Sequence, residues 1–157
     1  MPPTTPPAEE STPFLIYGAG ATAGQYLIQL LRLAGYKSII ATASPKNHEY
    51  LKSLGATDVF DYSDPELSSK ILSAAGGKPL KYAVDCVTAE ETLHKVAEVV
   101  GEGSIVSMLL PIKEGGSVTT KGEMWVELPE GINPFKKGVE VIGTRTFTFQ
   151  EVGYNFR

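Results

Sequence analysis

Residues 14–24 read FLIYGAGATAG, a short apolar run followed by three glycines. The apolar run lies between Ser11-Thr-Pro13 and a glycine, which predicts a buried strand. Beyond Gly24 the apolar side chains recur at helical spacing as far as Ala34, and Gly35 is expected to end that helix. The stretch therefore predicts a strand, a tight glycine turn and the start of a helix.

The alternation of strand and helix continues along the chain. Strands are predicted at 38–42, 58–60, 82–85, 104–110 and 139–142, and helices at about 46–54, 65–75 and 90–100. Gly55, Gly76-Gly77 and Gly101 are expected to end these helices. Because strands that alternate with such helices form βαβ units, we expect an α/β fold with a doubly wound, mostly parallel sheet and helices on both faces, the Rossmann fold. The loop-rich stretch 111–138 is left unassigned.

Composition indicates one soluble domain and excludes several classes of protein. The chain has 157 residues, 42% of them hydrophobic, and a net charge of −4 with scattered basic residues, which argues against nucleic-acid binding. One cysteine and two histidines do not suffice for a disulfide or a zinc site. No apolar run is long enough to span a membrane, so we expect a cytoplasmic protein. The proline-rich residues 1–13 are interpreted as a linker and 14–157 as the domain.

The glycine turn has the spacing Gly18-x-Gly20-x-x-x-Gly24. Gly18 suits a tight turn, and the small side chains Ala21, Thr22 and Ala23 would let the backbone approach a pyrophosphate. The helix N-terminus favours such negative charge, and Gly24 would let the helix pack against the strand. The spacing is one residue longer than the standard dinucleotide fingerprint. The alternative is a glycine-rich turn that binds no ligand.

The end of the second predicted strand distinguishes between two nicotinamide cofactors. An NAD site usually places an acidic residue there, about 20 residues beyond the glycines, to bind the ribose 2′-hydroxyl. Residues 42–47 read TASPKN and contain no acid. Ser44 and Asn47 can donate hydrogen bonds and Lys46 adds a positive charge, which suits a 2′-phosphate and favours NADP(H). Alternatively, Ser44 only caps the helix that begins near Pro45.

At this point the sequence resembles a known family, the medium-chain dehydrogenase/reductase superfamily, in its zinc-free quinone reductase and enoyl reductase branch. It is most similar to fungal enoyl-reductase-like oxidoreductases, including trans-acting partners of polyketide synthases. The stretches that carry the resemblance are 15–25 (LIYGAGATAGQ), 43–47 (ASPKN), 54–62 (LGATDVFDY) and 82–86 (YAVDC). The likeness covers 14–149, and the longer glycine spacing is usual in this branch.

The resemblance implies cofactor-binding positions at the carboxyl ends of the strands. Residues 21–24 would contact the pyrophosphate. Tyr62 would join Ser44, Lys46 and Asn47 at the 2′-phosphate. Farther along, Cys86, Val87 and Thr88 would approach the ribose and nicotinamide, and Leu109 and Leu110 would flank the nicotinamide. No catalytic residue and no metal ligand are assigned.

Several of these residues also have a purely structural interpretation. Tyr62 could be an ordinary aromatic at a strand end, and Cys86 is typical of a small buried apolar residue rather than a reactive thiol. Thr88 and Glu91 form a capping-box pattern, so Thr88 could be a helix cap. Asp85 is interpreted as a structural carboxylate at a strand end.

The resemblance implies the cofactor-binding domain of an NADPH-dependent oxidoreductase whose full-length parent transfers hydride to an activated C=C bond or a quinone. Family members are about twice as long and carry an N-terminal GroES-like domain, so we expect this chain to be a fragment and assign no turnover to it alone. The alternative is a non-catalytic nucleotide-binding or dimerisation module, since family members often form homodimers through the last strand, here 139–147. A short-chain dehydrogenase is set aside because no tyrosine has a lysine four residues later.

Overall fold

A computed structural model describes residues 7–116, 119 and 121–145 of the chain, with only the backbone of Leu110. Its elements, in chain order, are β1 (Phe14–Tyr17), α1 (Thr22–Ala34), β2 (Ile39–Ala43), the 3₁₀ helix η1 (Pro45–Asn47), α2 (His48–Leu54), β3 (Asp58–Asp61), α3 (Leu67–Ala74), β4 (Leu80–Asp85), α4 (Glu90–Ala97), β5 (Val100–Leu110), β6 (Ile112–Lys113), β7 (Met124–Trp125), η2 (Glu130–Ile132) and β8 (Glu140–Arg145). None of the helices in these parts of the chain has the length and hydropathy needed to span a bilayer.

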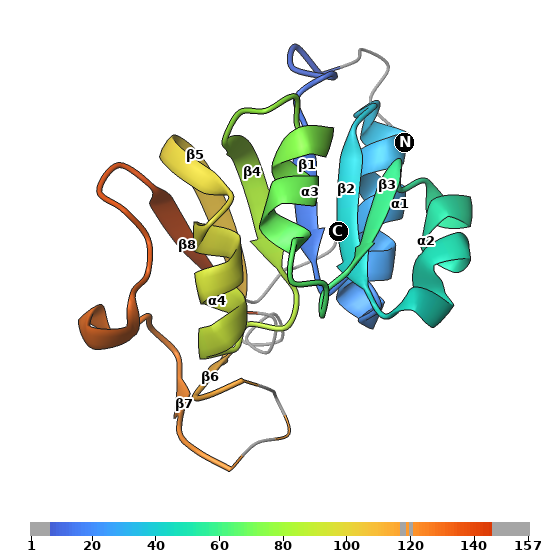
Figure 1. The fold of residues 1–157 in the computed structure, drawn as a ribbon. Coiled ribbons are helices and arrows are strands. Elements are labelled where there is room, and N and C mark those ends of the chain that lie inside the picture. Colours follow the sequence, from blue (N-terminus) through green and yellow to red (C-terminus); the bar gives the residue numbers. More distant parts are fainter. Residues whose placement is uncertain (1–6, 117–118, 120, 146–157) are drawn as a thin grey trace, which may run out of the picture.

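The main sheet has six strands in the order β3-β2-β1-β4-β5-β8, and every neighbouring pair is parallel. This is the strand order of the Rossmann fold, and it reverses direction beside β1. Figure 1 shows α3 and α4 in front of the sheet and α1 and α2 on its other side. The predicted doubly wound α/β fold is confirmed.

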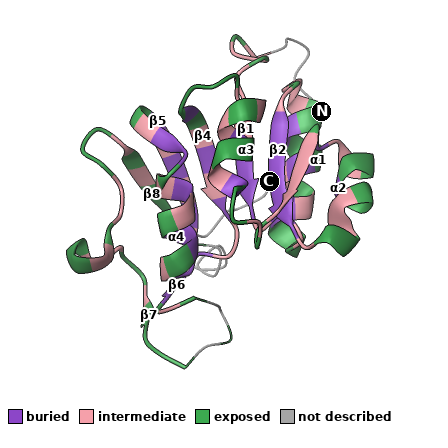
Figure 2. Cartoon of the chain, in the orientation of Figure 1, coloured by how far each residue is buried: buried purple, intermediate pink, exposed green. Residues whose placement is uncertain are grey.

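Alternating side chains of the strands form two buried clusters, one on each face of the sheet. Leu15 and Ile40 pack with α3 and α4 residues, whereas Ile16 and Ile39 pack with α1 and α2 residues. Both faces are therefore covered at the centre of the sheet, as Figure 2 shows by the buried strands between half-exposed helices. This packing explains why the strands read as continuous apolar runs.

Glycine ends two helices as expected. Gly35 and Gly55 both adopt left-handed conformations after α1 and α2, with φ of 98° and 119°. The prediction for α4 is wrong at its C-terminus, because α4 ends at Ala97 and Gly101 lies inside β5. The β-branched Val99 and Val100 are buried and pair with the start of β4, where the amide of Leu80 donates to Val99 O at 2.9 Å.

The unassigned stretch 111–138 contains a small antiparallel pair, β6 with β7. Trp125 packs on a third cluster formed by Leu93, Met108 and Ile112. The pair therefore packs against α4 and β5 and lies at the carboxyl edge of the main sheet, at the bottom of Figure 1. Residues 114–123 separate the two strands, which is too many for the short turns that identify a hairpin in a sequence.

Candidate functional site

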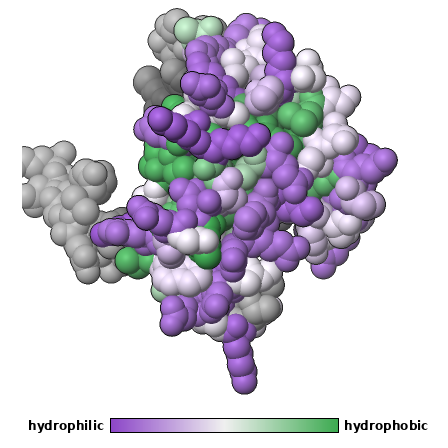
Figure 3. Space-filling model, turned by 60° about the vertical axis from the view of Figure 1, so that its left-hand side comes forward, coloured by the Kyte–Doolittle hydropathy of each residue, from purple (hydrophilic) through white to green (hydrophobic). Residues whose placement is uncertain are grey.

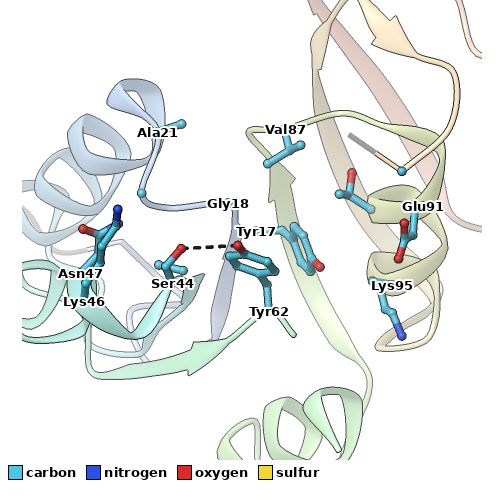
Figure 4. Close-up of a pocket in the computed structure, with 14 residues that line it drawn as sticks. Tyr17, Gly18, Ala21, Ser44, Lys46, Asn47, Tyr62, Val87, Glu91 and Lys95 are labelled. Atoms are coloured by element: carbon cyan, nitrogen blue, oxygen red, sulfur yellow. Dashed lines mark hydrogen bonds between the residues drawn. The ribbon is translucent and has the colours of Figure 1, made fainter. Parts of the chain in front are cut away.

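A cleft of about 660 Å³ lies at the carboxyl edge of the sheet, beside the point where the strand order reverses. Such crevices are where ligands bind in open α/β sheets. Figure 4 shows side chains from the glycine turn, from the ends of β2 and β3 and from α4 around it. The residues that line it are Tyr17, Gly18, Gly20, Ala21, Ala43, Ser44, Lys46, Asn47, Tyr62, Val87, Glu91, Thr92, Lys95 and Gly116.

The glycine turn forms one wall of the cleft, and side chains at Gly18 and Gly20 would crowd the neighbouring residues. Gly18 has a φ of 74°, and a Cβ there would lie 2.3 Å from Val87 Cγ2. Its amide donates to Thr42 Oγ1 at 3.0 Å, which ties the turn to the end of β2. A Cβ on Gly20 would lie 3.0 Å from Asn47 Nδ2. Glycine at both positions therefore keeps the backbone exposed to the cleft.

Helix α1 presents its N-terminus beside this turn. Its N-cap is Ala21, which has no side-chain acceptor, and its first turn contains no acid. The first α-helical bond runs from the Gln25 amide to Ala21 O at 3.0 Å, so the amides of 22–24 have no acceptor four residues back. These donors and the helix dipole suit an anion such as a phosphate.

Gly24 has the packing role expected of it. A Cβ there would lie 2.6 Å from Cα of Ala19, a backbone atom that cannot move aside independently. Gly24 is buried, and both it and the following Ile28 face the sheet. The glycine therefore sets how closely α1 approaches the turn.

A polar cluster from the ends of β2 and β3 forms the second wall. Ser44 Oγ and Tyr62 Oη lie 3.5 Å apart, and Tyr62 is half exposed. Lys46 and Asn47 follow on the short helix η1, and Figure 4 shows them on the same side of the cleft as Ser44. The structure thus brings together the four residues predicted around a 2′-phosphate, with no carboxylate at the end of β2.

Ser44 lies at a helix N-cap, as one interpretation predicted, but its side chain does not cap the helix. Ser44 occupies the N-cap position of η1, but its hydroxyl makes no capping hydrogen bond. Only its carbonyl takes part in the turn, accepting from the Asn47 amide at 2.9 Å. The hydroxyl is therefore turned toward Tyr62 and the cleft.

The turn between β4 and α4 is held by a buried carboxylate. Asp85 accepts hydrogen bonds from the amides of Val87 and Thr88, both at 2.9 Å, and from the Thr92 hydroxyl. Burial raises the pKa of Asp85, and these hydrogen bonds oppose that shift. Asp85 is a structural carboxylate, as predicted, and it fixes the position of Val87 above Gly18.

Thr88 is not the helix cap that its capping-box pattern predicts. The N-cap of α4 is Ala89, and Thr92 rather than Glu91 closes the turn by accepting from the Ala89 amide at 3.0 Å. Thr88 is fully buried in a left-handed conformation with φ of 54°, and its hydroxyl donates to Asp85 O at 2.9 Å. The strained turn displaces the helix start by one residue.

The remaining predicted residues lie outside the lining of the cleft. Ala23, Cys86 and Leu109 gather around a shallow hollow of about 230 Å³ between α1, β4 and β5. Burial raises the pKa of the Cys86 thiol to about 12, so it is protonated at neutral pH and behaves as the small apolar residue expected. Thr22 and Gly24 begin α1, and the Leu110 side chain lies outside the described part of the structure.

Sequence reasoning missed the wall that α4 contributes. Glu91, Thr92 and Lys95 line the cleft from this helix, and Tyr17 lines it at the end of β1. The spacing of Glu91 and Lys95 places both on one helix face, which was the only available signal. Burial and the neighbouring acids raise the pKa of Tyr17, so its hydroxyl stays protonated.

The family model for the zinc-binding dehydrogenases matches residues 23–153. A trans-enoyl reductase of Gibberella fujikuroi is 38% identical over 116 residues, 73% of this chain and 32% of that protein. A dual trans-enoyl reductase/FAD-dependent monooxygenase of Aspergillus terreus is 33% identical, over 89% of this chain and 19% of that protein. The chain thus spans about a third or less of the length of these curated relatives.

Solved structures show the same fold. A quinone oxidoreductase of Pseudomonas syringae superposes with a TM-score of 0.68 at 21% identity, over 90% of this chain and 40% of that one. The CurK enoyl reductase superposes with a TM-score of 0.67 at 19% identity, over 86% of this chain and 36% of that one. At these identities the likeness establishes the architecture alone.

Proposed function

Because the chain belongs to the zinc-binding dehydrogenase family, we propose that its cleft binds NADPH and that it is the cofactor-binding domain of an oxidoreductase. In the full-length protein the bound cofactor would supply hydride to an activated C=C bond or a quinone. The similarity to trans-enoyl reductases supports the first of these substrates. The chain's own residues would bind and orient the cofactor, and a substrate-binding domain outside residues 14–157 would complete the pocket.

One observation carries the proposal of NADPH over NADH. The glycine turn and the acid-free cluster of Ser44, Lys46, Asn47 and Tyr62 line the same cleft. An NAD site would be expected to hold a carboxylate at the end of β2. A hydroxyl pair, an amide and an ammonium group there would bind a 2′-phosphate and leave an unsubstituted ribose without its usual acceptor.

The cleft and the shallow hollow lie on either side of the glycine turn, and together they would suit an extended cofactor. The cleft with Gly20 and Ala21 would hold the adenosine and its 2′-phosphate. The apolar hollow with Ala23, Cys86 and Leu109 would receive the nicotinamide half. The protonated Cys86 thiol would serve there as an apolar contact rather than as a nucleophile.

The donor set does not fit a zinc site, despite the family's description. The sequence has one cysteine and two histidines. In the parts of the chain that the structure describes, no three potential ligands of the His, Cys, Asp or Glu types gather closely enough to hold a metal ion. His48 is engaged with Ala43 O at 3.0 Å. We therefore propose a zinc-independent cofactor domain and route no step through a metal.

Replacing Lys46 with alanine is expected to weaken NADPH binding about tenfold and to leave NADH binding within about twofold, because only NADPH carries the charge that Lys46 would contact. Isothermal titration of both cofactors measures this. Lys52→Ala is the matched control, since Lys52 lies on α2, pairs with Glu49 at 3.2 Å and does not line the cleft. Equal losses for both cofactors, or none, would contradict the assignment of Lys46.

The outer strand β8 supports a second proposal, a homodimer formed by pairing of this edge. Among the described residues β8 pairs with β5 on one side, and Ile142 is 43% exposed. The face that Figure 3 turns forward shows hydrophobic residues exposed between hydrophilic ones. An edge strand of this kind readily pairs with another chain. Sedimentation velocity is expected to give about twice the chain mass of 16.8 kDa at micromolar concentration, and a strict monomer would refute this pairing.

A further inference from the structure

The wall of the cleft formed by α4 has no part in the proposed phosphate contacts. Glu91 and Lys95 lie on this helix, and Figure 4 shows them across the cleft from Ser44 and Asn47, with Tyr17 between the two sides. Glu91 would repel a phosphate placed beside it, since like charges repel, and the ammonium of Lys95 on the same wall offsets that charge. With one charge of each sign, this wall is suited to an uncharged part of a ligand.

If the cleft binds NADPH, as proposed above and as this inference requires, the part of the cofactor at the α4 wall can be identified from the parts already placed. The glycine turn takes the pyrophosphate, and Ser44, Lys46 and Asn47 take the 2′-phosphate of the same ribose. The remaining part of that nucleoside is its base. The lining without a role so far includes Tyr17, Val87 and the α4 residues, with Ala43 and Gly116 beside them, so the base would lie among these residues.

The chemistry of this lining suits a purine with an exocyclic amine. Tyr17 is 5% exposed, and its ring supplies an apolar surface at the floor of the cleft. Glu91 is exposed at the rim, with Oε2 close to Gly116, where an added Cβ would lie 2.4 Å away. A carboxylate accepts hydrogen bonds and donates none, so it discriminates an amino group from a carbonyl oxygen.

We propose that Glu91 is a specificity-determining residue that selects adenine by accepting a hydrogen bond from its exocyclic amino group, with Tyr17 as the floor of the base slot. Hypoxanthine has a carbonyl oxygen at the same position, so the carboxylate would lose this hydrogen bond and could accept only from the ring N1–H beside it. The nearby ammonium of Lys95, 4.0 Å from Glu98, moderates the negative charge that a phosphate-bearing ligand meets on approach.

The experiment compares adenosine 2′,5′-bisphosphate with inosine 2′,5′-bisphosphate by isothermal titration of the 157-residue chain. The wild type is expected to bind the adenine compound about tenfold more tightly, a modest ratio because Glu91 is exposed. Glu91→Gln is expected to reduce this ratio to about twofold or less, since an amide both donates and accepts. Glu49→Gln, on the exposed face of α2 and outside the cleft, is expected to keep the wild-type ratio.

Either of two results would overturn the role of Glu91: equal affinity of the wild type for both bisphosphates, or an unchanged ratio in Glu91→Gln. NADPH is titrated into the same wild-type sample. Binding of NADPH together with equal affinity for the two bases would reject only the base-selecting role. Failure of NADPH and of both bisphosphates to bind would reject the proposed function and this inference with it.

Discussion

Gly24→Ala is expected to lower the free energy of unfolding by about 2 kcal/mol, the range found when an extra carbon is forced into a packed interior. In an ordinary helix the same substitution stabilises by up to about 1 kcal/mol, so the sign itself is informative. The reason is the contact with Ala19, whose Cα, C and O atoms would lie 2.6 to 3.0 Å from the new Cβ. Because that backbone belongs to the glycine turn, the N-terminus of α1 must move away and cofactor affinity is expected to fall as well.

Urea unfolding followed by circular dichroism measures the change in stability. Gly131→Ala is the control, since Gly131 lies in η2 and an added Cβ would meet no atom within 4 Å. We expect the control to remain within about 0.5 kcal/mol of the wild type. A Gly24→Ala variant as stable as the wild type would show that α1 does not pack against the turn as described.

Asp85→Ala is expected to cost about 3 kcal/mol of stability. The substitution leaves the part-buried amide of Val87 and the buried amide of Thr88 without their acceptor, and each unsatisfied group carries a desolvation cost. The Thr92 hydroxyl loses its bond to Asp85 and keeps Ala89 O as an acceptor at 2.9 Å. It also releases the left-handed Thr88, which those bonds hold in place. Val87 would then no longer be fixed above Gly18, so the cofactor cleft is expected to loosen.

The matched controls are Asp61→Ala and Asp85→Asn. Asp61 ends β3 as Asp85 ends β4, but it is partly exposed and its bonds to Ser63 can be replaced by water, so a loss below about 1 kcal/mol is expected. Asp85→Asn keeps an acceptor for the amides and should cost less than alanine. Equal stability of Asp85→Ala and the wild type in urea unfolding would refute the structural role.

The pH dependence of stability gives the sign of the Asp85 contribution. Burial raises its folded-state pKa above the ordinary value of 3.8. A raised pKa means that the folded state binds the proton more tightly. The contribution of Asp85 to the free energy of unfolding is therefore greatest below the unfolded-state pKa, and it declines as pH rises through the folded-state pKa. Asp85→Asn is expected to remove this decline.

The sequence was sufficient to predict the fold because each signal was local. The apolar runs at β1 and β2, the helical spacing through α1, and the glycines after α1 and α2 each determine their own neighbourhood. The topology then follows from the handedness and parallel pairing of βαβ units. The end of α4 was misjudged because Val99 and Val100 fit either a helix or a buried strand, and only pairing with β4 decides between them.

The site could be predicted from sequence only for residues in the glycine turn or directly after a predicted strand. Ser44, Lys46, Asn47 and Tyr62 are found that way, and they do line one cleft with the turn. The α4 wall was missed because Glu91 and Lys95 look like solvated helix charges until α4 is packed against β4 and β5. The cap at Ala89 was missed because the strain at Thr88 depends on Asp85, a contact that the capping pattern does not encode.

We propose that this cleft binds NADPH in preference to NADH. The most direct test of this preference is isothermal titration of the unmodified 157-residue chain with each cofactor in turn, in the same low-salt buffer. We expect one NADPH per chain, bound at least about tenfold more tightly than NADH, because Lys46 and the polar groups beside it at the end of β2 would meet the 2′-phosphate. Equal affinity for the two cofactors, tighter binding of NADH, or binding of neither would contradict it.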